Sequence, residues 1–85
     1  MSPTSHPEIG RELRVSELVP RTIVILHKGQ TLATLWVVEV LQEFVHFRAG
    51  AVNTEFIALR CGPDLEGVTD NTGSPMKLYE YLGEP

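Results

Sequence analysis

The chain has 85 residues, a net charge of −4 and a single cysteine, Cys61. Its length predicts one domain, because a chain of this size buries only about 60–65% of its unfolded surface and has little to divide between two cores. One cysteine excludes an internal disulfide and a cysteine-rich zinc site. The apolar fraction of 42% excludes an intrinsically disordered chain and is typical of a globular domain.

The negative charge comes from the C-terminal part of the chain. Residues 1–54 carry five basic and five acidic residues, whereas residues 55–85 carry two basic and six acidic residues. Nucleic-acid binding needs clustered Lys and Arg side chains that neutralise phosphates. The composition therefore disfavours a nucleic-acid partner.

The first seven residues, MSPTSHP, predict a flexible tail ahead of a single small β domain over residues 8–85. This segment has no basic flank followed by an apolar run, so it does not resemble a secretory signal. No apolar run in the sequence has the length of a membrane span. Together with the lone thiol, these features predict a cytoplasmic protein that does not associate with membranes.

Residues 8–19 permit two interpretations. The spacing of Ile9 and Leu13 allows a short N-terminal helix. Ser16 and Pro20 instead favour a turn, or a single helical turn, that leads into a strand. The sequence leaves helix or strand open for this segment.

Five strands are predicted in the remainder of the chain. Four consecutive apolar residues, IVIL, predict a buried strand that ends at a turn in which Gly29 takes a positive φ. The density of β-branched and aromatic residues extends the set, so that the predicted strands cover residues 23–27, 32–41, 44–49, 55–60 and 76–82. Residues 61–75, CGPDLEGVTDNTGSP, have the composition of a long loop.

The strand count and spacing predict an all-β fold, a small five-stranded bent barrel or roll. This arrangement is similar to Src-homology-3-like and Tudor-like barrels, a resemblance that rests on the number and spacing of strands. The alternative is an α+β fold in which a short N-terminal helix packs on an antiparallel sheet.

The most apolar stretch, WVVEVLQEFVHF over residues 36–47, suits either a helix with one polar face or a β-hairpin. Its valines and aromatic residues would cost a helix about 3–4 kcal/mol in propensity, and the same residues favour strands. With the turn at residues 42–43, Glu39 pairs with His46, and the wholly apolar face of this hairpin is predicted to be core: Trp36, Val38, Val40, Val45 and Phe47.

The other face of this hairpin is the candidate interface. It combines apolar and charged side chains, namely Leu35, Val37, Leu41, Phe44, Glu39, His46 and Arg48. Leaving its four apolar side chains in water would forgo about 6–12 kcal/mol. We therefore expect it to be covered, either by a second copy in a two-fold dimer or by the N-terminal segment or long loop of the same chain.

The sequence predicts no catalytic residues, no cofactor and no metal. His46 opposite Glu39 is half of a general-base arrangement, but no nucleophile is placed beside it, because nothing brings Cys61 there. The oxygen-bearing side chains of residues 64–71 do not match the spacing of a calcium-binding loop. Tyr79 and Tyr81 on the last strand are more typical of strand formers than of an aromatic pocket.

The expected function is that of a small, soluble, non-enzymatic protein-interaction or self-associating module, with a homodimer or another protein as its partner. One alternative is a small ligand-binding domain or enzyme with a site near His46, Glu39 and the loop of residues 61–75. A second alternative is a nucleic-acid-binding small barrel, which the negative charge disfavours.

Overall fold

The structure, a computed structural model, describes residues 8–49 and 54–83. The predicted flexible tail, residues 1–7, lies outside the described residues. These described residues form seven strands and one 3-10 turn: β1 (Glu8–Leu13), η1 (Val15–Glu17), β2 (Ile23–Lys28), β3 (Thr31–Val40), β4 (Phe44–Ala49), β5 (Thr54–Cys61), β6 (Gly67–Thr69) and β7 (Pro75–Gly83). All five predicted strands are confirmed within one residue of their expected bounds, and the hairpin interpretation of residues 36–47 is confirmed with them.

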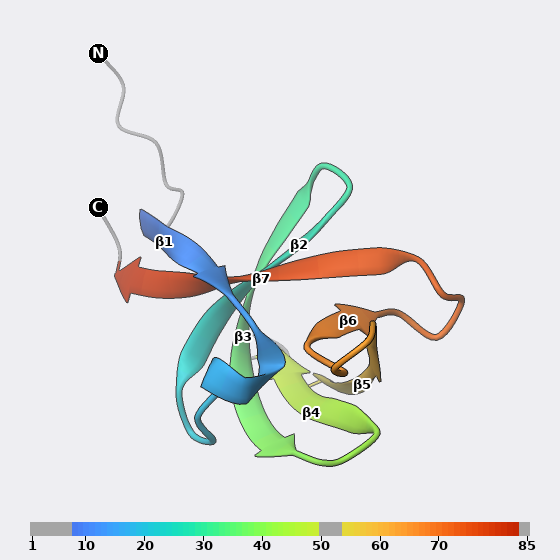
Figure 1. The fold of residues 1–85 in the computed structure, drawn as a ribbon. Helices are drawn as coiled ribbons and strands as arrows, with labels where there is room; N and C mark the ends of the chain where they lie inside the picture. The colour runs from blue at the N-terminus through green and yellow to red at the C-terminus, as the bar shows by residue number, and fades with distance from the viewer. Residues whose placement is uncertain (1–7, 50–53, 84–85) are drawn as a thin grey trace.

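The strands form a closed antiparallel barrel with one additional strand (Figure 1). The order β7-β2-β3-β4-β5-β6 returns to β7 through a β6–β7 pairing, so six strands close the barrel, and β1 pairs with β7 outside the ring. The all-β prediction is therefore confirmed. The strand count differs from five because β6 was not predicted and because the segment that forms β1 was left open between helix and strand.

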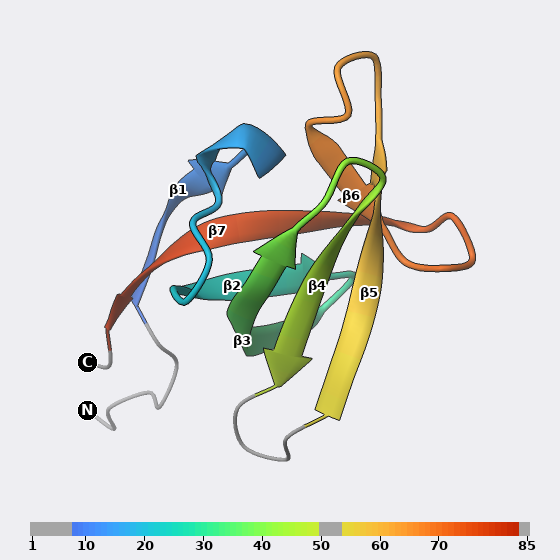
Figure 2. The same ribbon diagram turned by 90° about the horizontal axis from the view of Figure 1, so that it is seen from below.

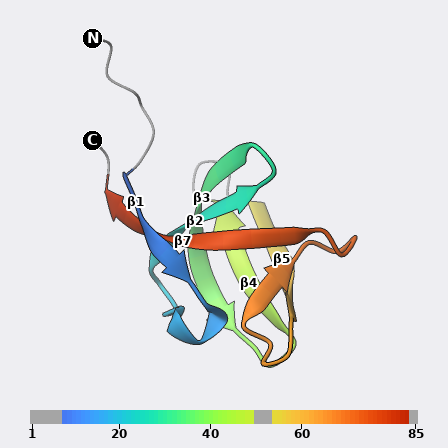
Figure 3. The ribbon, with the colours of Figure 1, turned by 45° about the horizontal axis from the view of Figure 1, so that its top comes forward.

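Strands β1 and β6 share one edge of β7 (Figure 3). β6 pairs with Met76 and Pro75, whereas β1 pairs with the part of β7 from Leu78 to its end, where Glu8 lies opposite Gly83. The expected alternative of an N-terminal helix is wrong, because the backbone groups of this segment pair with an edge of β7 that the short β6 leaves open.

The 3-10 turn η1 joins this N-terminal strand to the rest of the barrel. The Val15 N–H donates to the carbonyl oxygen of Glu66 at 3.0 Å, and the Ser16 N–H donates to the Glu66 carboxylate at 2.7 Å. Val15 itself is buried in the core. The turn predicted near Ser16 is thus confirmed, and it anchors the chain just before β6.

One hydrophobic core fills the barrel. Its buried members come from the segment around η1 and from strands β2 to β7: Val15, Leu18, Val24, Leu26, Leu35, Val37, Val45, Phe47, Ala58, Val68, Met76 and Leu78. Alternate residues of each strand point inward, as expected for a sheet closed on itself. Phe47 and Phe56 lie side by side in this core, with ring centroids 5.8 Å apart.

The β3–β4 hairpin contains a β-bulge that the sequence did not predict. Glu39 pairs with His46 as expected, but Val37 rather than Val38 then pairs with Phe47. The extra residue inverts the inward and outward positions of β3 on the N-terminal side of the bulge. The prediction that Trp36 and Val38 lie in the core is therefore wrong, since both are only half-buried, whereas Val45 and Phe47 are fully buried as predicted.

Candidate binding surface on strands β4 and β5

The outward-facing residues of β4 and β5 form a two-row surface, which we call the outer surface. Neighbouring positions across the two strands are Phe44 and Leu59, then His46 and Ile57, then Arg48 and Glu55. Figure 2 shows β4 and β5 side by side on one wall of the barrel. The surface is thus apolar at the end where β4 begins and charged at the other end.

Two large apolar side chains of the outer surface are exposed. Ile57 retains 48% and Leu59 retains 42% of its accessible area. Phe44, beside Leu59, is half-buried. Contiguous apolar side chains at the surface often mark interaction sites, whereas isolated ones need no explanation.

The structure corrects the composition of the predicted interface. Leu35 and Val37 retain only 2% and 0% of their accessible area, so the prediction that they face outward is wrong. The bulge at Val38 turns both of them into the core. The other members of the predicted set do not belong to the core cluster of fully buried residues: Glu39, Leu41, Phe44, His46 and Arg48.

Sequence reasoning missed the contribution of β5. Residues 55–60 carry apolar side chains at both alternating positions, so their outward face was not identified from the pattern. The short connection between β4 and β5 was the available signal, because strands joined in this way usually pair. That pairing places Ile57 beside His46 and Leu59 beside Phe44.

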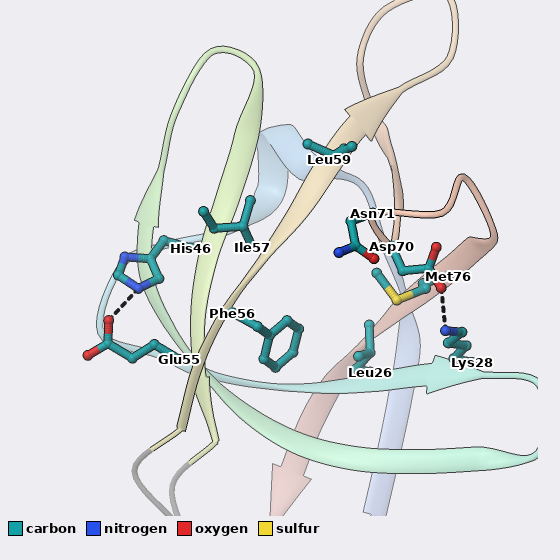
Figure 4. Close-up of a pocket in the computed structure, with 10 residues that line it drawn as sticks. All are labelled: Leu26, Lys28, His46, Glu55, Phe56, Ile57, Leu59, Asp70, Asn71 and Met76. Carbon is teal, nitrogen blue, oxygen red and sulfur yellow. Dashed lines mark hydrogen bonds and ion pairs between the residues drawn. The ribbon is translucent and has the colours of Figure 1, made fainter.

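An open groove of about 760 Å³ adjoins the outer surface along the edge of β5. Figure 4 shows β5 on one side, with His46 and Ile57 turned to its outer face and Phe56 turned toward Leu26 and Met76 on the other. Ten of the described residues line the groove: Leu26, Lys28, His46, Glu55, Phe56, Ile57, Leu59, Asp70, Asn71 and Met76. Its size falls within the range of about 300–1,000 Å³ that is typical of ligand sites.

The wall opposite β5 is fixed by Asp70. Its carboxylate accepts hydrogen bonds from the Lys28 ammonium on β2, from the Thr72 hydroxyl and N–H, and from the Ser74 N–H. Hydrogen bonding from Lys28 and then from Thr72 holds the pKa of the Asp70 carboxyl far below its ordinary value of 3.8. These contacts tie the 70–74 turn to the end of the β2–β3 hairpin.

The edge of β5 that faces this groove is only partly paired. β6 pairs with β5 at residues 59–61 alone, and at residues 55–58 the described part of the chain pairs with β5 only through β4 (Figure 2). The Arg60 N–H donates to the Glu43 carbonyl oxygen, on the β4 side. Because backbone groups alternate in direction along a strand, those of Ile57 and Glu55 point away from β4, toward the groove.

The charged groups around the groove are engaged in ion pairs. His46 Nε2 lies 2.7 Å from Glu55 Oε1 on β5, whereas Glu39 is its register partner on β3. The predicted register of Glu39 with His46 is therefore confirmed, and the side chain that His46 contacts is that of Glu55. None of the described residues that line the groove is a serine, threonine or cysteine.

The residues of the predicted alternative site, namely His46, Glu39 and the 61–75 loop, lie together only in part. His46 lines the groove with Asp70 and Asn71 of that loop, but Glu39 does not. Cys61 also lies outside the residues that line it. In the part of the chain that the structure describes, no three His, Cys, Asp or Glu side chains are grouped as metal ligands would be.

Comparisons with known proteins give no relative. No family model, no curated protein and no solved structure matches the chain significantly. None of the helical segments among residues 8–49 and 54–83 has the length and apolar character needed to cross a membrane.

Proposed function

We propose that the protein is a non-catalytic protein-interaction module that binds its partner through the outer surface of β4 and β5. The observation that carries this proposal is the exposure of Ile57 and Leu59 beside the half-buried Phe44. A side chain of this kind gains about 1.5–3 kcal/mol when it is fully buried, so the exposed halves of Ile57 and Leu59 would gain about 1 kcal/mol each on binding. The charged end, with Arg48 and Glu55, would form the polar rim that interfaces usually have.

The non-catalytic assignment is supported by the chemistry of the groove. Glu55 would orient the imidazole of His46, but a general base also needs a nucleophile, or a water held by further polar groups, on which to act. The remaining lining residues are mostly apolar or already engaged, as Lys28 is with Asp70. A groove of this composition suits binding by contact better than proton transfer.

The net charge of the protein and its single thiol support a protein partner in the cytoplasm. The net charge of −4 works against binding to nucleic acid, whose phosphates would be repelled. Cys61 is free and half-buried, a state that a reducing compartment maintains.

The test replaces Ile57 with a photo-crosslinking amino acid and irradiates living cells that express the protein. We expect a specific crosslinked band, whether it contains a second copy or a different protein. The matched control carries the same amino acid at Val19, which retains 57% of its accessible area but is not part of the outer surface. Equal crosslinking from both positions, or none from position 57, would overturn the proposal.

A further inference from the structure

We infer that the groove binds an extended segment of a partner protein, which adds to the edge of β5 as an antiparallel strand. This inference rests on the proposed protein-interaction function and specifies the kind of partner. It starts from residues 55–58 of β5, which among the described strands pair only with β4 and leave their other edge toward the groove, and from the apolar groove beside them. Strand addition of this type obtains affinity from main-chain hydrogen bonds and specificity from pockets for alternate side chains.

The backbone of β5 offers the hydrogen bonds that such a strand requires. The Arg60 N–H points to β4, and backbone groups alternate in direction from one residue of a strand to the next. Ile57 and Glu55 lie an odd number of residues from Arg60, so each directs its N–H and its C=O toward the groove. In an antiparallel pair, residues of this kind exchange both of their hydrogen bonds with the residue opposite. The added strand would continue the line of β6, which ends where the chain turns at Asp70.

The shape of the site favours a single extended segment over a second folded copy. The position opposite Leu59 is already filled by Thr69, so only the short stretch of residues 55–58 is open. On its far side the groove is closed by the end of β2 and the 70–74 turn, which Lys28 and Asp70 hold together (Figure 4). The edge of another folded sheet would meet this wall, whereas a single strand needs only about 5 Å beside β5.

The side chains around the edge define the chemistry of the segment. A ligand residue opposite Ile57 lies on the outer surface beside that apolar side chain and is expected to be apolar. The next residue, opposite Phe56, points into the groove toward Leu26 and Met76 and is also expected to be apolar. The third lies opposite Glu55, whose side chain is 55% exposed, and is expected to be Lys or Arg.

Charge complementarity beyond the groove supports the basic residue. Residues 55–85 carry six acidic and two basic residues, so this part of the chain attracts positive charge. The segment is thus an extended chain with the order apolar, apolar, basic from its N-terminus to its C-terminus.

The experiment titrates the full-length protein with the peptide acetyl-Thr-Val-Leu-Lys-Thr-amide and follows backbone amides by NMR. We expect the amide signals of Ile57 and Glu55 to shift and their exchange with solvent to slow. The same peptide with Glu in place of Lys should bind about two- to fivefold more weakly. In the Glu55→Lys variant this preference should invert, provided that the remaining signals of the variant match the wild type.

A matched pair of modified peptides tests the hydrogen bonds. Methylation of the Val nitrogen removes the N–H that would donate to Ile57, and binding should be lost. Methylation of the Leu nitrogen alters an N–H that points away from β5, and binding should persist. Equal binding of the two methylated peptides would overturn strand addition.

The outcomes separate this inference from the proposed function. If no peptide shifts the β5 amides at about 1 mM, a concentration that detects even weak complexes, strand addition is wrong. Crosslinking from position 57 would then still support an interaction module that binds in another way. If the amides of Ile57 and Glu55 instead respond to protein concentration without peptide, the edge pairs with a second copy, and the inferred partner is wrong.

Discussion

Asp70 shows how one side chain organises a binding groove. It accepts hydrogen bonds within its own turn, from Thr72 and Ser74, and it also holds Lys28 from a different hairpin. An aspartate that bonds to the backbone two residues further on is a common turn former, and this turn lies within the long loop predicted for residues 61–75. The contact with Lys28 is long-range and follows from the closed barrel.

Asp70 should make the stability of the protein depend on pH in the acid range. Because its pKa is lower in the folded state than the ordinary value of 3.8, its contribution is fully present above that value. The contribution is lost as the pH falls toward the lower folded pKa, where the carboxylate becomes protonated. The Asp70→Asn variant should therefore differ most from the wild type at neutral pH and progressively less below about pH 4.

Urea unfolding at a series of pH values measures this difference. Lys28→Met, which removes the main partner, should lower the stability at neutral pH in the same direction, and the double variant should lose less than the sum of the two. Lys77→Met is the control, since Lys77 is an exposed lysine on β7 that does not contact Asp70. A constant gap between wild type and Asp70→Asn down to pH 2 would contradict the assignment.

Among the elements, the β3 strand determines which apolar residues become core. Between residues 35 and 40 it has apolar side chains at both alternating positions, interrupted only by Glu39. Inward and outward faces are therefore set by the bulge at Val38 and by the hydrogen bonds of β3 with its neighbours. On the β2 side, the Val37 N–H donates to Thr22, and the Val37 carbonyl oxygen accepts from Arg21, which fixes the inner position of Val37.

The inverted inward and outward positions of β3 can be tested with the same substitution, Leu to Ala, at two positions of the strand. Leu35→Ala should cost about 2–5 kcal/mol of unfolding free energy, because Leu35 is buried and its removal leaves a cavity. Leu32→Ala on the same strand should cost less than about 1 kcal/mol, since Leu32 retains 40% of its accessible area. Chemical denaturation of both variants gives the two values. Similar costs for the two would mean that Leu35 faces outward after all.

The same strand explains how much could be predicted from the sequence. Strands β2 to β5 and β7 follow from residue type and spacing, and the outward positions of Phe44, His46 and Arg48 follow from simple alternation along β4. A bulge adds one residue without any signal in a uniformly apolar run, so Leu35 and Val37 were misplaced.

The groove was harder to predict from the sequence than the outer surface. Its far wall includes the 70–74 turn, which directly follows β6, a strand of only three residues within a loop rich in Gly, Pro and Asp. A strand this short has too few residues to show a period. The pairing of β6 with both β5 and β7 is a property of the closed ring and is absent from any local stretch of sequence.

For the whole molecule, the correction of Leu35 and Val37 weakens the expected drive toward a homodimer. A two-fold contact through the outer surface would cover Ile57 and Leu59 from each copy, which gives about 4 kcal/mol at about 1 kcal/mol per side chain. That free energy corresponds to a dissociation constant near 1 mM, before the cost of association is counted. Any dimer formed through this surface is expected to be weak.

Sedimentation over a range of concentrations tests this prediction. The wild type should be monomeric at tens of micromolar and remain mainly monomeric up to about 1 mM, and Leu59→Lys should remove any residual association. Val19→Lys, which adds the same charge outside the outer surface, should leave it unchanged. A tight dimer that survives Leu59→Lys would mean that the copies meet through a different surface.

The pairing of Glu8 with Gly83 places the first and last described strands side by side. A short Gly- and Ser-rich linker between these ends should therefore allow circular permutation, with new termini opened at the exposed Gly29–Gln30 turn. In the natural chain, β1 and β7 are separated by almost the full length of the sequence. In the permuted chain they should form a local hairpin within the same barrel. The same cut separates β2 from β3, so their local hairpin becomes a pairing between the two new ends of the chain. Local and long-range contacts therefore largely exchange, the contact order changes little, and stopped-flow refolding of the two forms should give similar rates.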